Sequence, residues 1–325
     1  MAPSRRALPV GWSDMASSHS GSAPVYAALA GNALVAISKF AAGFFTGSSA
    51  MLSEGVHSLV DTGNELLMLY GMHRAALPPD RDHPLGHGRE LYFWTFIVAL
   101  LIFSLGAVIS VYEGVDHVLD PRPFENVLIN YGVLGLSAVF EGASWYVAFR
   151  RMREEKGAHG YIDAIRRSKD PTTFTVLFED SAALIGIFIA FCAIFLGHQF
   201  SLPWFDGLGS ILIGLVLAAT AFFLARETKA LLIGEQAFPS VQRRLVEIAE
   251  AAPAVVRVNG LTTVHLGPEQ VVATLSAEFE DERTTPEIEA SVQRIERKLK
   301  EELPQISALF IKPRATGEAA HRLSD

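Results

Sequence analysis

The chain has 325 residues, of which 50% are hydrophobic, and its mean hydropathy is +0.28. This balance is too apolar for an ordinary soluble domain and is typical of a protein partly embedded in lipid. A formal net charge of -8 at pH 7 excludes the basic surface of a nucleic-acid-binding protein. The single cysteine, Cys192, excludes an internal disulfide and a thiolate cluster, so a bound metal must be held by histidine and carboxylate side chains.

The N-terminal segment, residues 1–23, is rich in Ser, Gly and Pro and lacks the hydrophobic core of a cleavable signal peptide. We expect it to be a disordered cytoplasmic tail. Six apolar segments follow, each close to the roughly 20 residues that a helix needs to cross a bilayer. We therefore expect a transmembrane domain of six helices over residues 24–230. The segments are Val25–Phe45, Met51–Met72, Tyr92–Tyr112, Val127–Phe149, Phe174–Leu196 and Phe205–Leu224.

Ionisable residues interrupt the second and fifth of these segments. The second carries His57, Asp61 and Glu65, and the fifth carries Glu179 and Asp180. Such residues are rare at membrane depth and mark ion pathways. His57 and Asp61 are four positions apart, so both project from one helix face, as two ligands of one metal would. Glu179 and Asp180 are adjacent and point about 100° apart, so only one of them is expected to share that centre at full contact.

A structural role is the alternative for these residues. His57 and Asp61 could simply hydrogen-bond each other, and Asn64, one turn further on, could be a packing residue, a support for a ligand or a ligand itself. Several carboxylates in one apolar region, however, would repel one another and be protonated unless a cation were present. An imidazole with carboxylates suits Zn, Fe, Co, Ni or Mn better than Ca.

Basic residues near the ends of the apolar segments predict how the chain is oriented in the membrane. Arg74, Arg81 and Arg89 lie between the second and third segments, and seven more basic residues lie in 150–169, whereas the connections on the opposite side contain only Arg122. By the positive-inside rule, both termini face the cytoplasm. Lys39 is a lone cation in the first segment. It either extends to the outer interface or forms a structural ion pair, and we expect the former.

The loop PPDRDHPLGHGRE contains a concentration of possible metal ligands, namely Asp80, Asp82, His83, His87 and Glu90. Two interpretations are open. The loop could hold a metal ion at the inner mouth of the protein, or it could be a solvated loop whose PLGHGR turn docks the third span, since loop histidines bind metal weakly without a pre-formed geometry.

The sequence after Leu224 becomes soluble in character. From Ser240 on, apolar residues repeat at helical spacing, beginning with Val241. Strands are expected at Val255–His265 and Val271–Phe279, and a second helical stripe precedes a last strand at Ala308–Ile311. The order αββαβ predicts a small cytoplasmic α+β domain over residues 235–313, with a flexible tail at 314–325. We expect its lone His265 to be a hydrogen-bonded strand histidine, and His159, His198 and His321 to lie on the surface.

Three strings carry a family resemblance: SSAMLSEGVHSLVDTGNELLMLYG, PPDRDHPLGHGRE and VLFEDSAALIG. In this order and spacing they resemble the cation diffusion facilitator family of metal exporters. HSLVDTGNE with LFEDSAALIG resembles, more narrowly, the branch that contains the mitochondrial zinc transporter of animals. The resemblance covers about Val25 to Lys312 and implies a ferredoxin-like cytoplasmic domain and a homodimer.

The resemblance also implies a metal site. His57, Asp61 and Asp180 fall on three ligand positions of the family, whereas Val176 occupies the fourth, where His or Asp is usual. Glu179, Asn64 or a water would then complete the shell. Asp80, His83 and His87 match a loop site, and the histidines of a cytoplasmic site are missing except for His265.

The function implied is export of a divalent metal by proton antiport, in the inner membrane of a bacterium. Zinc is expected first, with Mn, Fe, Co or Cd as alternatives. A non-transporting, metal-sensing membrane protein is a second possibility. A membrane metallohydrolase is disfavoured because the chain has no HExxH or G-x-S-x-G string, so we expect no enzyme.

Overall fold

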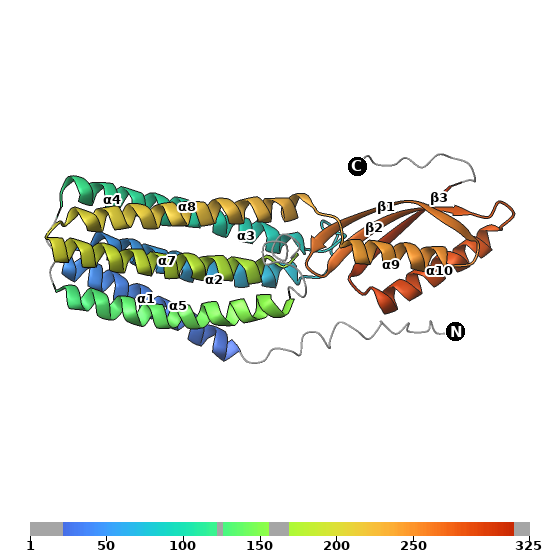
Figure 1. The fold of residues 1–325 in the computed structure, drawn as a ribbon. Coiled ribbons are helices and arrows are strands. Elements are labelled where there is room, and N and C mark those ends of the chain that lie inside the picture. The colour runs from blue at the N-terminus through green and yellow to red at the C-terminus, as the bar shows by residue number, and fades with distance from the viewer. Residues whose placement is uncertain (1–21, 122–125, 156–168, 315–325) are drawn as a thin grey trace.

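The computed structural model describes residues 22–121, 126–155 and 169–314. The predicted tails, 1–23 and 314–325, lie almost wholly outside the described residues, as do Arg122, His159 and His321. A bundle of long helices forms one end of the molecule and a small sheet with two helices forms the other (Figure 1).

Six long helical rods make up the bundle, one for each predicted segment, and each extends beyond the predicted bounds. The third rod is α-helical at both ends and has a π-helical turn, η2, in its middle. The elements are α1 (Ser22–Thr46), α2 (Ser49–Ala75), α3 (Arg89–Leu101), η2 (Ile102–Ala107), α4 (Val108–Leu119), α5 (Val127–Glu155), α7 (Pro171–Phe200) and α8 (Trp204–Ile233).

Four of the rods are long and apolar enough to cross a membrane: Arg89–Leu119, Val127–Arg150, Phe174–Phe200 and Trp204–Ile233. α2 is less apolar because Glu54, Asp61 and Glu65 interrupt it. The bundle also exposes large apolar side chains, such as Phe44, Leu128 and Phe222, while it buries charged ones. An apolar exterior around a polar interior is the arrangement that a lipid environment favours. The protein is therefore a membrane protein, and a six-span count remains a prediction.

Glycines allow a close contact between α4 and α8. A Cβ added at Gly114 would lie 2.6 Å from the backbone oxygen of Gly207, and the reverse distance is also 2.6 Å. Small residues at such crossings let membrane helices approach closely enough for their backbones to pack.

A buried carboxylate, Asp206 at the start of α8, ties the bundle together at the end far from the sheet. Its Oδ1 accepts from Ser48 Oγ at 2.7 Å, and its Oδ2 accepts from the backbone N–H groups of Ser49 and Ala50. His117 Nε2 on α4 lies 3.8 Å from the same oxygen. Asp206 thus satisfies N–H groups at the start of α2 that have no partner within that helix.

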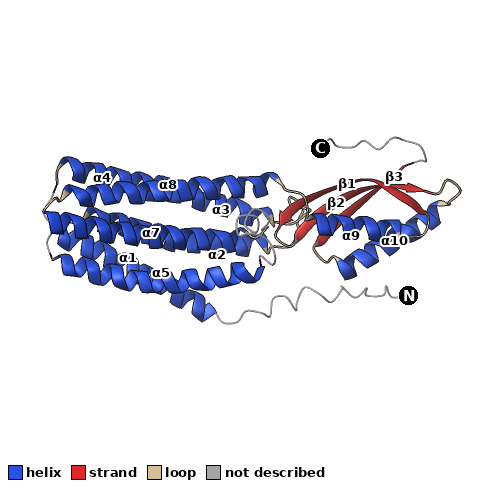
Figure 2. Ribbon diagram, in the orientation of Figure 1, coloured by secondary structure: helices blue, strands red, loops and turns tan. Residues whose placement is uncertain are grey.

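The C-terminal part consists of α9 (Pro239–Glu250), β1 (Val255–Gly267), β2 (Gln270–Phe279), α10 (Thr285–Glu302) and β3 (Ile306–Arg314). This is the predicted order αββαβ. β2 is the central strand, antiparallel to β1 and parallel to β3. Its alternate residues Val271, Ala273, Leu275 and Ala277 are fully buried, which agrees with the predicted period of two. Both helices cover one face of the sheet (Figure 2).

The bundle and the sheet meet through the loop that follows α2. Gly88 packs on the β1–β2 turn so closely that a Cβ there would lie 2.7 Å from the backbone oxygen of Leu266. Lys169, just before α7, forms an ion pair with Glu235, just after α8. The loop therefore packs against the sheet as well as leading into α3.

Candidate metal centres

A cavity inside the bundle brings together most of the ionisable residues of the membrane helices. It lies among α1, α2, α5 and α7, and five carboxyl groups line it. Its lining residues are Asn32, Ser58, Asp61, Glu65, Glu141, Val176, Glu179 and Asp180. Carboxylates from three helices at one place inside an apolar bundle form a site with a strong preference for cations.

His57 and Asp61 meet on α2 as their spacing predicts. His57 Nε2 lies 3.1 Å from Asp61 Oδ2, across one helical turn. His57 is buried and contacts the cavity through Asp61, which lines it directly. The imidazole therefore contacts the carboxylate that lines the cavity and does not itself line it.

Glu179 and Asp180 on α7 both line the cavity. That only one of them shares the His57–Asp61 centre at full contact stays a prediction. Glu179 accepts a hydrogen bond from Asn64 Nδ2 on α2 at 2.8 Å, and Asp180 accepts one from Ser144 Oγ on α5 at 2.7 Å. The cavity extends across α7 from α2 to α5, so two carboxylates that point about 100° apart can border it from opposite sides.

The predicted set His57, Asp61 and Asp180 does not form a closed ligand shell in this conformation. Within the described ranges, three His or acidic ligand atoms lie within 4.8 Å of one another only in the loop, at Asp80, His83 and His87. In the cavity, hydrogen bonds from Asn64 and Ser144 hold Glu179 and Asp180. The assignment of the membrane ligands thus stays a prediction.

The prediction that Lys39 extends to the outer interface is wrong. Its ammonium is fully buried and donates to Glu54 Oε2 at 3.0 Å and to Ser58 Oγ at 2.8 Å. α1 and α2 are joined by a tight turn at Gly47, so Lys39 and Glu54 face each other at similar distances from that turn. An ion pair costs less than an unpaired ammonium in an apolar bundle.

Glu141 and Asn32 are two further residues of the cavity, and the sequence did not assign a role to either of them. Glu141 on α5 lines the cavity, and its Oε1 lies 4.0 Å from the ammonium of Lys39. Asn32 on α1 donates to Glu65 Oε1 at 2.5 Å. The only sequence signal for either was a polar residue within an apolar segment, because their partners lie on other helices.

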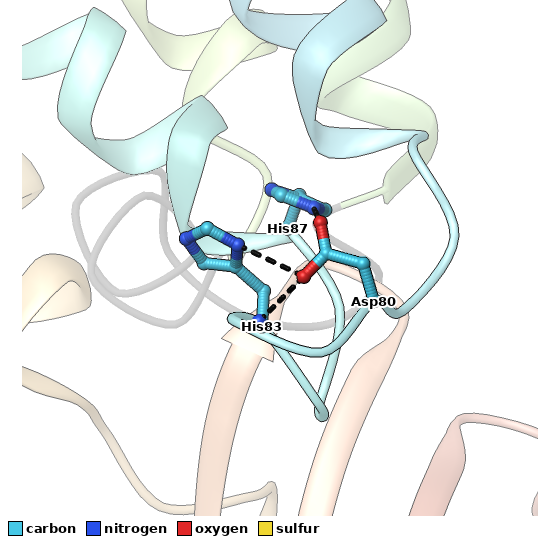
Figure 3. Close-up of side chains that lie close together, drawn as sticks. All are labelled: Asp80, His83 and His87. Carbon is cyan, nitrogen blue, oxygen red and sulfur yellow. Dashed lines mark hydrogen bonds and ion pairs between the residues drawn. The ribbon is translucent and has the colours of Figure 1, made fainter.

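The loop trio forms a compact cluster (Figure 3). His83 Nδ1 lies 3.2 Å from Asp80 Oδ1, and His87 Nε2 lies 3.1 Å from Asp80 Oδ2. The backbone N–H of His83, the two imidazoles and the N–H of Asp82 hold the pKa of Asp80 down at about 2. Two imidazole nitrogens beside a carboxylate that is charged at neutral pH are a suitable donor set for a transition metal.

The other loop and domain residues have structural partners. Glu90 accepts hydrogen bonds from Arg74 Nη2 and from Trp94 Nε1, both at 2.9 Å. His265 is buried, as predicted for a strand histidine, with Nδ1 3.1 Å from Gly267 O, and burial lowers its pKa. His198, at the end of α7, is exposed as predicted.

A family model for the cation efflux transmembrane domain matches residues 25–233 of this chain. The chain therefore belongs to the cation efflux, or cation diffusion facilitator, family of metal transporters. It is 34% identical over 258 residues to the mitochondrial proton-coupled zinc antiporter SLC30A9 of Xenopus laevis, covering 79% of this chain and 46% of that protein. The branch predicted from HSLVDTGNE and LFEDSAALIG is thus confirmed.

Two other relatives agree with this assignment. Metal tolerance protein C4 of Arabidopsis thaliana is 34% identical over 205 residues, which are 62% of this chain and 45% of that protein. The cation-efflux pump FieF of Shewanella oneidensis is 24% identical over 229 residues, 70% of this chain and 72% of the pump. A solved MamM C-terminal domain matches 24% of this chain and 98% of its own length, at 23% identity and a TM-score of 0.23. The chain spans about half the length of the first two relatives.

Proposed function

We propose that this chain transports a divalent transition-metal cation, zinc in the first place, through the cavity bordered by Asp61, Glu179 and Asp180. The observation that carries the proposal is the convergence of five carboxyl groups on one cavity inside a bundle with an apolar exterior. Without a cation these groups would repel one another and lose their solvation for no structural gain.

The proposed ligands are His57, Asp61 and Asp180, with Glu179 in the fourth position. Val176 lines the cavity at the position where the family resemblance implies a ligand, and its side chain cannot bind a metal. Glu179 lines the same cavity, and Asn64 supports it with a hydrogen bond. An imidazole among carboxylates favours zinc and cobalt, and a shift toward carboxylate ligation would favour manganese or cadmium. Mn, Fe, Co and Cd are therefore the alternative substrates.

Proton antiport follows from the same donors. A histidine nitrogen or a carboxylate cannot hold a proton and a metal on the same lone pair, so metal entry releases protons and proton entry releases metal. The relatives named proton-coupled zinc antiporters support this assignment.

We propose that the sheet domain lies in the cytoplasm and that two chains associate through it. Arg74, Arg81 and Arg89 lie at the end of the bundle where the sheet is attached, which supports a cytoplasmic location for that end and for both termini. The loop trio lies at this end too and would gather cations at the inner mouth. Export from the cytoplasm of a bacterium, across its inner membrane, is the resulting proposal.

The experiment that tests this function is competitive transport. Purified protein in liposomes with a pH gradient is given zinc together with Mn, Fe, Co or Cd, and the ions accumulated are measured. Preferential zinc accumulation that requires the protein supports the proposal. A non-transporting metal sensor, the rival function, would bind the ions and accumulate none of them.

His57→Asp is predicted to change selectivity. The variant keeps two ligands at the same spacing on α2 but replaces nitrogen by oxygen, so it should reduce the preference for zinc over manganese by about tenfold while transport continues. It also exchanges a nitrogen donor for a carboxylate, and protons compete with the metal differently at the two groups, so we expect the pH profile of flux to change. An unchanged metal ranking together with an unchanged pH profile would make His57 a packing residue.

Asp80→Ala is predicted to weaken zinc binding at the loop by about tenfold or more, because it removes the carboxylate that both imidazoles contact. Titration calorimetry on the full chain carrying Asp61→Asn isolates the loop site. Asp82→Ala, which removes a neighbouring exposed carboxylate, is the matched control and should bind normally.

The loop site should also lose zinc on acidification. Because the pKa of Asp80 is about 2, this carboxylate stays charged from pH 7 to pH 5. A loss of zinc over that range would then involve the two histidines rather than Asp80, because a histidine nitrogen binds metal only when it carries no proton. Binding that is independent of pH between 7 and 5 would exclude the two histidines as ligands.

A further inference from the structure

Lys39 has an unusual position for a lysine in a membrane protein. Its ammonium is held by Glu54 Oε2 at 3.0 Å and Ser58 Oγ at 2.8 Å, and its side chain is only 1% exposed. A buried ammonium is costly even when it is paired, and an apolar pair of similar size would often give an equally stable protein. Packing and stability alone therefore do not explain a lysine at this position.

The ammonium lies next to the metal cavity. Two of its neighbours, Ser58 and Glu141, line that cavity, with Glu141 Oε1 4.0 Å from Nζ. Glu54 does not line the cavity. Its second oxygen faces Gly186 on α7, where any added Cβ would collide with it. The Lys39–Glu54 pair is thus oriented with its positive end toward the cavity and its negative end away from it.

A fixed positive charge at this place acts on any cation that enters. It repels a divalent ion, and it offsets part of the negative charge of the five carboxyl groups while the cavity is empty. A transport site must bind its ion firmly enough to admit it and weakly enough to release it. A cavity lined by five carboxyl groups, with no positive charge nearby, would hold the bound metal ion too tightly to release it.

We propose that Lys39 is a built-in cation that lowers the metal affinity of the cavity, and that Glu54 limits this effect by pairing with it. This inference rests on the proposed function of the cavity as the transport site. It assigns to Lys39 an electrostatic role on affinity, without contact with the transported ion.

The two partners are expected to act in opposite directions. Glu54→Gln leaves the ammonium uncompensated beside the cavity and should weaken zinc binding by about tenfold or more. Lys39→Met should bind zinc at least as tightly as the unmodified chain and should release it more slowly. Adding Lys39→Met to Glu54→Gln should restore the affinity to within about threefold of Lys39→Met alone.

The measurement is zinc titration calorimetry on the full chain in detergent. All variants carry Asp80→Ala and His83→Ala, two exposed loop positions, so that the loop does not contribute. Lys39→Arg keeps the charge and is the matched control, with an affinity close to that of the parent. Thermal unfolding of each variant identifies loss of fold. If Lys39→Met does not fold, Lys39→Gln, whose amide can still donate to Glu54, replaces it with the same expected result.

Two results would overturn the inference. One is equal weakening by Lys39→Met and Glu54→Gln with no rescue in the double variant, which is the pattern of a purely structural ion pair. The other is normal affinity in Glu54→Gln. Asp61→Asn in the same background separates this failure from that of the proposed function: if it binds zinc normally, the cavity is not the metal site, whatever Lys39 does.

Discussion

Asp61→Asn is expected to reduce zinc flux by about 100-fold or more while the protein still folds. Asp61 is the carboxylate that lines the cavity and also contacts His57, at 3.1 Å. The amide has nearly the same shape but no charge, so it keeps the packing and loses the carboxylate that we propose binds the metal. Loss of a group that merely supports a ligand costs 10 to 100-fold, and loss of the ligand itself should cost at least the upper value.

The flux of Asp61→Asn is measured in liposomes at equal protein content. Glu113→Gln on α4 is the matched control, because it neutralises a carboxylate of the same bundle that does not line the cavity. The control should transport normally. Normal flux in Asp61→Asn, with a normal unfolding temperature, would exclude Asp61 as a ligand of the transported ion.

Asp206→Ala is expected to cause the largest loss of stability, about 2 to 4 kcal/mol in the free energy of unfolding. The substitution leaves the Ser48 hydroxyl and two N–H groups at the start of α2 without their acceptor, in a region closed to water. An apparent unfolding temperature lower by about 5 °C or more in detergent is the measurable result.

Asp206→Asn is the graded control for this prediction. Its amide oxygen can still accept one of the hydrogen bonds, so its unfolding temperature should fall between those of the Ala variant and the parent chain. Because Asp206 does not line the cavity, zinc affinity per folded molecule should stay unchanged in both variants. An unfolding temperature in Asp206→Ala equal to that of the parent would show that the network does not hold α2 to α8.

Local spacing explains what could be predicted of the site. His57 and Asp61 contact each other within one helix, and Asp80, His83 and His87 lie within eight residues of one loop. For such groups, the period of the helix or the shortness of the loop limits the possible distances. The strands of the sheet domain were predictable for the same reason, since alternation along β2 depends only on the pleat.

Contacts between helices could not be derived in this way. The burial of Lys39 against Glu54, and the presence of Glu141 and Asn32 at the cavity, depend on how α1, α2 and α5 are rotated against each other. Periodicity within one apolar segment contains no information on that rotation, because nearly every face of such a segment is apolar. The position of Glu179 and Asp180 on one cavity likewise depends on how α7 packs against α2 and α5.

The π-helical turn η2 had no sequence signal either. Ile102–Ala107 has the sequence of a continuous apolar helix, and in the structure it packs against α8 and α2. Such turns are frequent near functional sites in membrane and soluble helices alike, but nothing in the composition of this segment distinguishes it from its neighbours.

Simultaneous recording of zinc and proton flux tests the central claim most directly. Liposomes containing the protein, an internal zinc dye and an internal pH dye are given external zinc while their interior is acidic. We predict that zinc enters and that the internal pH rises over the same time course, because protons leave as zinc enters. Asp61→Asn should abolish both signals. Zinc entry without proton movement, or equal signals from Asp61→Asn and the parent chain, would contradict proton-coupled metal transport through this cavity.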